Sequence, residues 1–321
     1  MSGTRLVIGA RRSPLSRVQA TWVGDRLEAR WPGLRVEYRF ISTGGDRDPH
    51  TPLPAIGSKG LFTEDLERAL RESRIDVAVH SLKDLPVDSP EGITLAAVPP
   101  REDPRDVLVV RDSLVAPGTD AEGQRVLRRL PPGARVGTSS LRRAAQVRAA
   151  RADLEPRPVR GNVDTRLRKL EEGRFEALVL AAAGLRRLGL WPAGAYAMDE
   201  GWLPAPGQGA LGLQCRAAQD GVRTRVQALD DPVARAEVTA ERALLAVLEG
   251  GCRVPIAARA SLEGGDLRLR AAVYSVEGGA PVVDRETGPA AVPGDVGLRL
   301  ARRMLASGAA ALVERARGFS Q

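Results

Sequence analysis

The chain has 321 residues, more than one hydrophobic core usually supports, and 43% of them are apolar, so two or three globular domains are expected. Two cysteines and two histidines are too few for a disulfide framework and leave little room for a metal cluster or a Ser-His-Asp triad. No run of about 18 apolar residues and no basic, apolar leader occurs, which predicts a cytoplasmic protein without a membrane span.

The formal net charge of +8 comes almost entirely from arginine, because lysine occurs only at positions 59, 83 and 169. Most arginines are expected to lie solvated on the surface, but a planar guanidinium can also hold a carboxylate through two parallel hydrogen bonds. Aromatic residues make up only 3% of the chain and 40 residues are acidic, so a nucleic-acid-binding surface is not expected. The composition therefore favours small anionic ligands.

The first hundred residues alternate apolar strands with helices, which predicts an α/β lobe. The predicted strands are residues 6–10, 36–41 and 76–79. Helices are predicted to begin at Ser13-Pro14 and at Thr63, whose hydroxyl should cap its helix. The proline-rich stretch 99–104 interrupts this pattern, as an exposed crossover into another domain would.

A second α/β pattern follows, and a second crossover, residues 203–209, ends it. Its predicted strands are residues 106–110, 135–137, a short one near 158–159, and 177–180, with helices beginning at Ser140 and Asn162. Two crossovers predict a chain that leaves the first lobe, builds the second and returns. A ligand cleft would then lie between the two lobes.

The last hundred residues differ, with a predicted helix at 233–248, three strands between 252 and 285, and a closing helix from 295. This order of elements is typical of an α+β domain. We therefore predict three domains: residues 1–100 with 203–228, residues 105–202, and residues 229–321.

Candidate anion sites occur where strands lead into helices. Arg11 and Ser13 lie at such a turn, where backbone N–H groups and the helix dipole favour negative charge. Residues 137–143 repeat the arrangement in the second lobe, with hydroxyls followed by two arginines. Residues 160–166 form a third turn, in which Arg160 and Arg166 flank small residues. The pattern predicts a ligand with several carboxylates.

Two further residues are candidates for chemistry. Asp84 follows a buried strand, the position at which open α/β sheets present catalytic groups, and it could act as an acid or base or simply cap the next turn. Cys252 lies in a Gly-Gly-Cys turn, where it could be modified or buried. Cys215 ends an apolar strand and is expected in the core.

Several motifs together resemble the signatures of the porphobilinogen deaminase family, in the same order and nearly from end to end. They are His80-Ser81-Leu82-Lys83-Asp84-Leu85-Pro86, residues 137–143, residues 160–167, residues 204–210, and Glu249-Gly250-Gly251-Cys252-Arg253-Val254-Pro255. Residues 57–62 resemble the mobile loop of the family, although Ser58 stands where glycine is common. Ser16 likewise replaces a frequent alanine, and neither change affects a residue assigned to chemistry.

This resemblance implies an α/β fold with two lobes like those of type II periplasmic binding proteins around a central cleft, and a smaller α+β C-terminal domain. It implies a hydroxymethylbilane synthase, a transferase of porphyrin biosynthesis that condenses four porphobilinogen molecules with release of ammonia. The chain would grow on a dipyrromethane cofactor in thioether linkage to Cys252, and hydrolysis would release the linear tetrapyrrole. The enzyme would be a monomer that needs no metal or nucleotide.

The resemblance also implies a role for individual residues. Asp84 would be catalytic, since a fixed carboxylate can stabilise positive charge on pyrrole nitrogens and move protons. The predicted cofactor-binding residues are Cys252, Lys83, Ser81, Thr138, Ser139, Ser140, Arg142, Arg143, Arg160, Gly161, Arg166 and Gln208. The predicted substrate-binding residues are Arg11, Ser13, Lys59, Arg160, Arg166 and Arg187.

Two other functions remain open at this point. A two-lobed receptor could close on a small anion without transforming it, since fold alone does not specify function, but it leaves Asp84 and Cys252 without a role. An RNA-binding protein would use the basic surface and show strong salt dependence, although no local motif supports it. Ammonia release from porphobilinogen distinguishes the enzyme from both.

Overall fold

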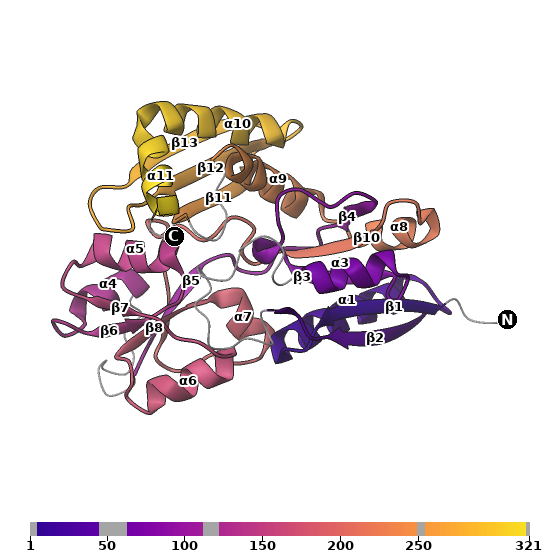
Figure 1. Cartoon of the computed structure of the whole chain (residues 1–321), viewed down its shortest axis with the longest axis horizontal. Helices are drawn as coiled ribbons and strands as arrows, with labels where there is room; N and C mark the ends of the chain where they lie inside the picture. The colour runs from indigo at the N-terminus through magenta and orange to yellow at the C-terminus, as the bar shows by residue number, and fades with distance from the viewer. Residues whose placement is uncertain (1–4, 45–62, 112–121, 249–253, 319–321) are drawn as a thin grey trace. The chain divides into compact units, whose positions relative to one another are not determined.

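The computed structural model describes residues 5–44, 63–111, 122–248 and 254–318, and these form two compact units. The first unit contains the residues up to 102 together with 209–238, and the second contains 103–208 together with the residues from 239 onward. Figure 1 labels most of the helices and strands.

The first unit is built on a five-stranded mixed sheet with the order β2-β1-β3-β10-β4. Its strands are β1 (Arg5–Arg11), β2 (Arg35–Ile41), β3 (Val77–Ser81), β4 (Ile93–Ala97) and β10 (Leu211–Arg216). Its helices are α1 (Pro14–Arg30), α3 (Glu64–Arg71), the short 3₁₀ helix η1 (Leu82–Asp84) and α8 (Asp220–Gln227). Strand β1 runs parallel to β2 and β3, whereas β10 runs antiparallel to β3 and β4.

Strand β1 is buried on both faces, which explains its uninterrupted apolar sequence. Leu6 and Ile8 belong to the same core cluster as Val23 of α1. Val7 points to the other face, because side chains alternate along a strand, and packs in the cluster that contains Leu66 of α3. Helices α1 and α3 therefore cover opposite faces of this sheet. The carboxyl ends of β1 and β3 are left side by side at one edge.

Thr63 stands at the N-cap position of α3, as predicted, but the predicted bond from its hydroxyl is wrong. Its backbone is helical, with φ −117° and ψ −32°, and its Oγ1 makes no cap hydrogen bond. A capping side chain needs an extended backbone to reach the N–H groups of the first turn. The N–H groups of Leu66 and Glu67 bond to the Thr63 carbonyl instead, at 3.0 and 2.9 Å. The hydroxyl is left buried without a partner.

The second unit contains a five-stranded sheet of the same design, with the order β7-β6-β8-β5-β9. Its strands are β5 (Asp106–Val110), β6 (Arg135–Gly137), β7 (Glu155–Arg157), β8 (Ala177–Ala181) and β9 (Ala195–Ala197). The helices associated with it are α4 (Gly123–Arg129), α5 (Leu141–Ala150), α6 (Val163–Glu171) and α7 (Ala182–Arg187). Strand β6 is parallel to β7 and β8, and β5 is antiparallel to β8 and β9.

The strands that follow the two predicted crossovers occupy equivalent places in the two sheets. Strand β5 follows residues 99–104 and β10 follows residues 203–209, and each runs antiparallel to both of its neighbours. The strand expected near residues 158–159 is instead β7, which ends at Arg157. Glu155 and Arg157 bond to the β6 side, and the next N–H that faces this side, that of Val159, donates instead to Ser139 Oγ at 3.1 Å.

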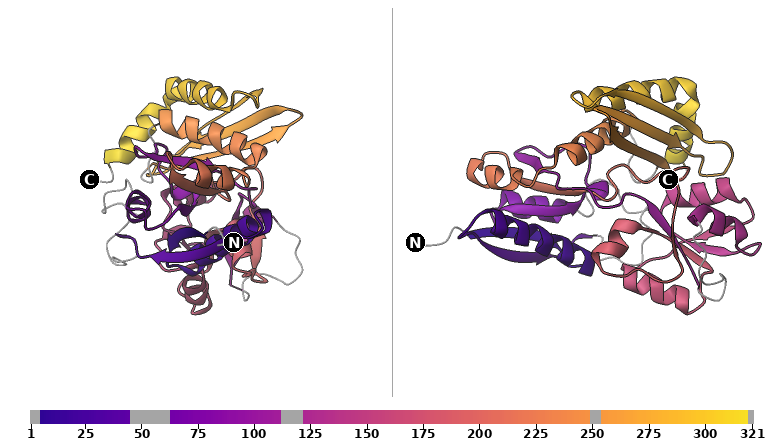
Figure 2. Two further views of the ribbon diagram at one scale, coloured as in Figure 1. Left: turned by 90° about the vertical axis from the view of Figure 1, so that its right-hand side faces the viewer. Right: turned by 180° about the vertical axis from the view of Figure 1, so that it is seen from behind.

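The C-terminal region forms a three-stranded antiparallel sheet in the order β11-β12-β13, flanked by helices. Its elements are α9 (Pro232–Val247), β11 (Ile256–Glu263), β12 (Asp266–Val273), β13 (Val282–Pro289), α10 (Pro293–Met304) and α11 (Ala310–Gly318). Residues from Asp266 to Ala271 of β12 alternate between exposed and buried, and α10 packs on β12 and β13 (Figure 2). The predicted α/β class with a smaller α+β C-terminal region is confirmed.

The three-stranded sheet packs against α5 of the same unit. Ala145 of α5 and Leu203 of the second crossover share a buried cluster with Ala257, Ala272 and Tyr274. Helix α5, which carries the two predicted arginines Arg142 and Arg143, therefore packs against the C-terminal sheet as well as against the five-stranded sheet of its unit.

Candidate functional site

In the first unit, the predicted catalytic and substrate-binding residues meet at the carboxyl ends of β1 and β3. Asp84 ends the short helix η1 that follows β3, and its side chain is exposed. Arg11 is the last residue of β1. Both line one small pocket together with Ser16, Thr63, Val79, His80 and Ser81. The structure thus brings Arg11, Ser81 and Asp84 together, as expected for neighbouring parallel strands.

The other predicted residues of this unit lie close by in the chain but have different surroundings. Ser13 caps α1, since its Oγ accepts a hydrogen bond from the Ser16 backbone N–H at 3.3 Å and donates to Ser16 Oγ at 2.8 Å. Ser81 Oγ accepts from the side-chain amide of Gln19 at 3.1 Å, so Gln19 orients it. Lys83 is half-buried in η1.

His80 was considered in the sequence only as a metal ligand or triad member, yet it lies beside Asp84 in this pocket. Burial lowers its pKa to about 4, an effect that Gln214 opposes and that the positive charge of Arg11 reinforces. The imidazole is therefore neutral near pH 7. The opposing effect of Gln214 is that of a hydrogen bond between its side chain and the imidazole. A histidine at the end of an apolar strand was the available signal for this feature.

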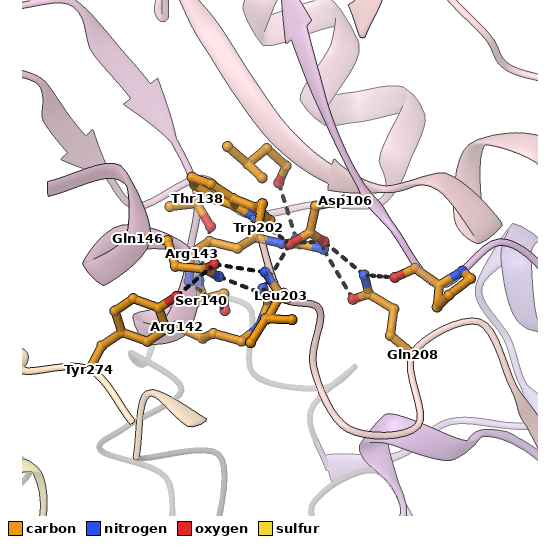
Figure 3. A network of polar contacts seen from close by, with 12 residues as sticks. Asp106, Thr138, Ser140, Arg142, Arg143, Gln146, Trp202, Leu203, Gln208 and Tyr274 are labelled. Carbon is orange, nitrogen blue, oxygen red and sulfur yellow. Dashed lines mark hydrogen bonds and ion pairs between the residues drawn. The ribbon is translucent and has the colours of Figure 1, made fainter. Parts of the chain in front are cut away.

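In the second unit, two of the predicted arginines meet at one buried carboxylate, that of Asp106 (Figure 3). Arg142 Nη1 donates to Oδ2 at 2.8 Å, and Arg143 donates to Oδ1 from Nε at 3.1 Å and from Nη2 at 2.7 Å. Trp202 Nε1 donates to Oδ2 at 2.9 Å and Gln208 Nε2 to Oδ1 at 2.8 Å. Asp106 is 0% exposed, so these bonds replace all of its contact with water.

Sequence analysis identified Asp106 only as the start of a strand. The signal was an acidic residue opening an apolar run, Asp106 to Val110, directly after the first crossover. A carboxylate at the start of a buried strand must be paired, because an unpaired buried charge is very costly. The arginines that pair with it could not be chosen from the sequence, since they lie 36 and 37 residues further along the chain.

The charges in this cluster do not balance among the described residues. Burial by itself would raise the pKa of Asp106, but the guanidiniums of Arg142 and Arg143 hold it well below its usual range. Burial lowers the pKa of Arg142, and Asp106 opposes that change. Two buried guanidiniums therefore face one carboxylate. Both bonds that Arg142 donates, to Asp106 and to the Leu203 carbonyl at 2.8 Å, leave from Nη1, which leaves Nε and Nη2 for another acceptor.

The predicted hydroxyls of residues 138–140 shape the turn that leads into α5. Thr138 Oγ1 accepts from the Ser140 N–H at 3.2 Å. Ser139 Oγ donates to the Val159 carbonyl at 2.7 Å and accepts from the Val159 N–H at 3.1 Å. Ser140 caps α5 by accepting from the Arg143 N–H at 3.4 Å. These bonds fix the start of α5, and with it the two arginines.

The third predicted turn lies before α6. Gly161 has φ +110°, a backbone conformation that favours glycine, and its carbonyl accepts from Arg166 Nε at 2.8 Å. Burial lowers the pKa of Arg166 to about 10, and the nearby positive charge of Arg143 adds to this effect. Arg166 therefore adds positive charge close to the Asp106 cluster. Arg160 is half-buried, and its carbonyl accepts from Lys169 Nζ at 2.9 Å.

Three predicted residues remain. Arg187 is half-buried at the end of α7. Cys252 and Lys59 lie outside the described residues, as does the whole of the loop 57–62. Cys215 is buried in β10 and belongs to the core of the first unit, as predicted.

Comparison with known proteins decides the family. Residues 6–231 match the model described as "Porphobilinogen deaminase, dipyromethane cofactor binding domain", and residues 235–306 match "Porphobilinogen deaminase, C-terminal domain". The chain belongs to the porphobilinogen deaminase family. The predicted resemblance is thereby confirmed.

Two porphobilinogen deaminases illustrate how far the similarity extends. That of Roseiflexus castenholzii is 48% identical over 309 residues, which are 96% of this chain and 98% of the relative. That of Pelobacter propionicus is 45% identical over 315 residues, 98% of each chain. Among solved structures, an ancestral arginine-binding protein bound to arginine aligns with 71% of this chain and 92% of its own, at 14% identity and a TM-score of 0.36.

No described helix is long and apolar enough to cross a membrane. No cluster of three or more histidine, cysteine, aspartate or glutamate side chains suited to a metal ion occurs in the same part of the chain.

Replacing Asp106 with asparagine should strongly destabilise the second unit of this porphobilinogen deaminase. The change leaves two buried guanidiniums without a countercharge, and breaking a buried ion pair in this way costs about 3–5 kcal/mol. Urea unfolding at pH 7 measures the loss.

The pair Arg151–Asp153 provides the control, since the Asp153 side chain is 45% exposed and Asp153→Asn should destabilise the protein far less than Asp106→Asn. The guanidiniums lower the pKa of Asp106, so its contribution is present at neutral pH and is lost as the pH falls below the usual carboxyl range of about 4. Wild-type stability should therefore fall more steeply in acid than that of Asp106→Asn. Equal stability of Asp106→Asn and wild type at pH 7 would contradict this account of the cluster.

Proposed function

We propose that this chain is a hydroxymethylbilane synthase. It condenses four porphobilinogen molecules with release of ammonia on a covalently attached dipyrromethane, and then releases the linear tetrapyrrole hydroxymethylbilane by hydrolysis. Family membership over nearly the whole chain supports the reaction. The observation of this structure that carries the proposal is the surplus of buried positive charge around Asp106.

The chemistry of the second unit fits a dipyrromethane, whose pyrrole rings carry acetate and propionate groups. Arg142 keeps Nε and Nη2 for a carboxylate, and a carboxylate there would restore the missing negative charge. Arg143 and Arg166, whose positive charges interact, add to the positive charge near Arg142. When bound, the dipyrromethane supplies the pyrrole to which the first substrate unit is joined.

The remaining cofactor-binding assignments are also proposals. Cys252 would form the thioether, and the backbone at Gly161 and the side chain of Gln208 would border the bound group. The hydroxyls of Thr138, Ser139 and Ser140 would act by fixing the start of α5, since the structure uses each of them within the turn. Ser81 and Lys83 are also assigned to cofactor binding.

Asp84 would be the catalytic residue. Its carboxylate is exposed at the end of η1, so it can reach a ligand, and Arg11 lines the same pocket. A fixed carboxylate stabilises positive charge that develops at a pyrrole nitrogen and can accept and return its proton. Arg11 would bind a substrate carboxylate. Ser13, Lys59, Arg160, Arg166 and Arg187 would complete the substrate site.

We also propose three domains, residues 1–100 with 203–228, residues 105–202 and residues 229–321. The gap between the two family models, at residues 232–234, supports a boundary close to the start of the third. We further propose that the protein is a monomer, that it works in the cytoplasm and that it binds no nucleic acid. Pairing of exposed arginines with acids, as in Arg5–Glu37 and Arg135–Glu176, supports the last point because it neutralises basic surface.

Intact-mass measurement tests the proposed enzyme at the cofactor. Active wild-type protein should be heavier than its encoded chain by one dipyrromethane, and brief exposure to porphobilinogen should add pyrrole-sized increments. Cys252→Ser should lack both, because a serine hydroxyl is a far poorer nucleophile than a thiol. Cys215→Ser is the matched control and should retain both. An active wild type at its bare polypeptide mass would contradict the proposal, as would added mass on Cys252→Ser.

Replacing Asp84 with asparagine tests the catalytic assignment separately. Asparagine has nearly the same shape but carries no charge, so the variant should fold and keep the added cofactor mass. Its steady-state ammonia release should fall about 10²- to 10⁴-fold, the usual contribution of a general acid or base. Near-normal ammonia release would remove Asp84 from catalysis while leaving the cofactor assignment intact.

A further inference from the structure

Three buried polar side chains of the first unit, Glu67 of α3, Gln214 of β10 and His80 of β3, have no role in the proposed reaction. Glu67 is 5% exposed, Gln214 is 0% exposed and His80 is 5% exposed. Buried polar groups lower stability unless each of them is paired. The way in which these three groups satisfy one another determines how the His80 ring is held.

The register of β3 and β10 brings Gln214 and His80 together. Gly212 lies opposite His80, and Gln214 follows two residues later, so its side chain points to the same face of the sheet. Residues placed diagonally in this way are within reach of one another when their side chains are long. Ala78 is on the same face of β3 and packs with Leu66 of α3, so this is the face that α3 covers.

Two hydrogen bonds connect the three side chains. Gln214 Nε2 donates to Glu67 Oε1 at 3.5 Å, and the Gln214 side chain is also hydrogen-bonded to the His80 imidazole. The second bond favours the protonated imidazole, as expected where an amide oxygen accepts from a ring N–H. Because Glu67 takes the nitrogen side of the amide, the oxygen side is left for His80. Glu67 thus selects, through Gln214, which ring nitrogen of His80 carries the proton.

The His80 ring forms part of the wall of the pocket that contains Asp84 and Arg11. Burial lowers the pKa of the ring to about 4, the bond to Gln214 opposes this change, and the positive charge of Arg11 adds to it. The ring is therefore uncharged at pH 7. An imidazolium at this place would attract the Asp84 carboxylate and repel positive charge that develops on a pyrrole, whereas a neutral ring leaves the carboxylate to the substrate.

We infer that Glu67 and Gln214 are positioning residues of the substrate site, which hold the His80 ring in one orientation and one tautomer beside Asp84. This inference deepens the proposed function and rests on it. The charged groups that act on the ring are Arg11 of β1, Asp84 of η1 and, through Gln214, Glu67 of α3. A ring released from Gln214 could turn its N–H toward Asp84 and pair with the carboxylate that the reaction needs.

Two substitutions of Glu67 separate positioning from charge, because both remove the negative charge of the carboxylate. Glu67→Gln keeps an oxygen that can accept from Gln214, so it should keep wild-type rates of ammonia release. Glu67→Met has a similar length but no such acceptor, so ammonia release should slow by about 3- to 10-fold, the effect of losing one neutral hydrogen bond. Equal losses in the two variants would overturn the inference, since charge rather than position would then matter. Wild-type rates in both would also overturn it.

Nuclear magnetic resonance reads the tautomer without turnover. The chain has only two histidines, His50 and His80, so His50→Gln leaves a single imidazole to assign. At pH 7 the ring nitrogens of His80 in the cofactor-bearing protein should show one neutral tautomer, and Glu67→Gln should retain it. Glu67→Met and Gln214→Met should show a mixture of tautomers or the other one. A mixture in wild type, or an unchanged tautomer in Glu67→Met, would contradict the inference even if Gln214→Met did not fold.

Asp76→Asn is the control for a purely structural effect. Asp76 is half-buried in the same unit, accepts from the Val7 N–H at 2.9 Å and pairs with Arg216 at 3.1 Å. Its replacement should lower stability to urea but leave the His80 tautomer and the rate of ammonia release unchanged. A rate as low as that of Glu67→Met would overturn the inference, because lost stability would then explain both variants. Absence of ammonia release from wild type would instead overturn the proposed function, and the tautomer would still be measurable.

Discussion

The buried carboxylate of Asp106 is the interaction on which the second unit depends. It holds the two guanidiniums of α5, the indole of Trp202 and the amide of Gln208 at one point. Each of these groups would be costly to bury alone, and together they are satisfied because the carboxylate accepts from all of them. The same bonds attach β5, α5 and the second crossover to one another. The two guanidiniums exceed the single carboxylate by one positive charge, and these bonds hold that charge in a rigid site. Recognition of a carboxylate ligand requires such a fixed position.

The C-terminal sheet adds a second constraint on the same region. Tyr274 donates from its hydroxyl to Gln146 Oε1 at 3.1 Å, and Gln146 also bonds the backbone of Leu203 on both its N–H and its carbonyl. The buried carboxylate of Glu241 in α9 accepts from the N–H groups of Gly207 and Ala260, at 2.6 and 2.8 Å. The second crossover is thereby fixed to both sheets of its unit. A displacement of the C-terminal sheet would consequently alter the position of the Leu203 carbonyl, to which Arg142 donates a hydrogen bond.

The two groups of functional residues differ in electrostatic character. The cluster around Asp106 is strongly charged and holds excess positive charge, which suits a permanently bound polyanion. The pocket beside Asp84 combines one carboxylate and one arginine with neutral, partly unsatisfied groups. The carboxylate suits the movement of a proton, and the arginine suits a substrate carboxylate.

Much of this could be predicted from the sequence because local patterns determine it. Apolar runs bounded by caps located most strands and helices, and strand-to-helix turns located Arg11, Asp84 and the arginines of α5. Asp106 and Glu241 could not be assigned, because their roles depend on partners far away in the chain. The predicted capping of α3 by the Thr63 hydroxyl was wrong, because the helical backbone of Thr63 keeps the hydroxyl from the N–H groups of the first turn. The neutral state of His80 likewise depends on burial that no local pattern reveals.

The central claim is that the guanidiniums held by Asp106 bind the carboxylates of the cofactor. A crystal structure of the protein with its covalent cofactor tests this most directly. The account predicts a cofactor carboxylate within hydrogen-bond distance of Nε or Nη2 of Arg142, with Nη1 still bonded to Asp106 and Leu203. A cofactor whose carboxylates bond elsewhere, with Nε and Nη2 of Arg142 facing protein groups or water, would contradict it.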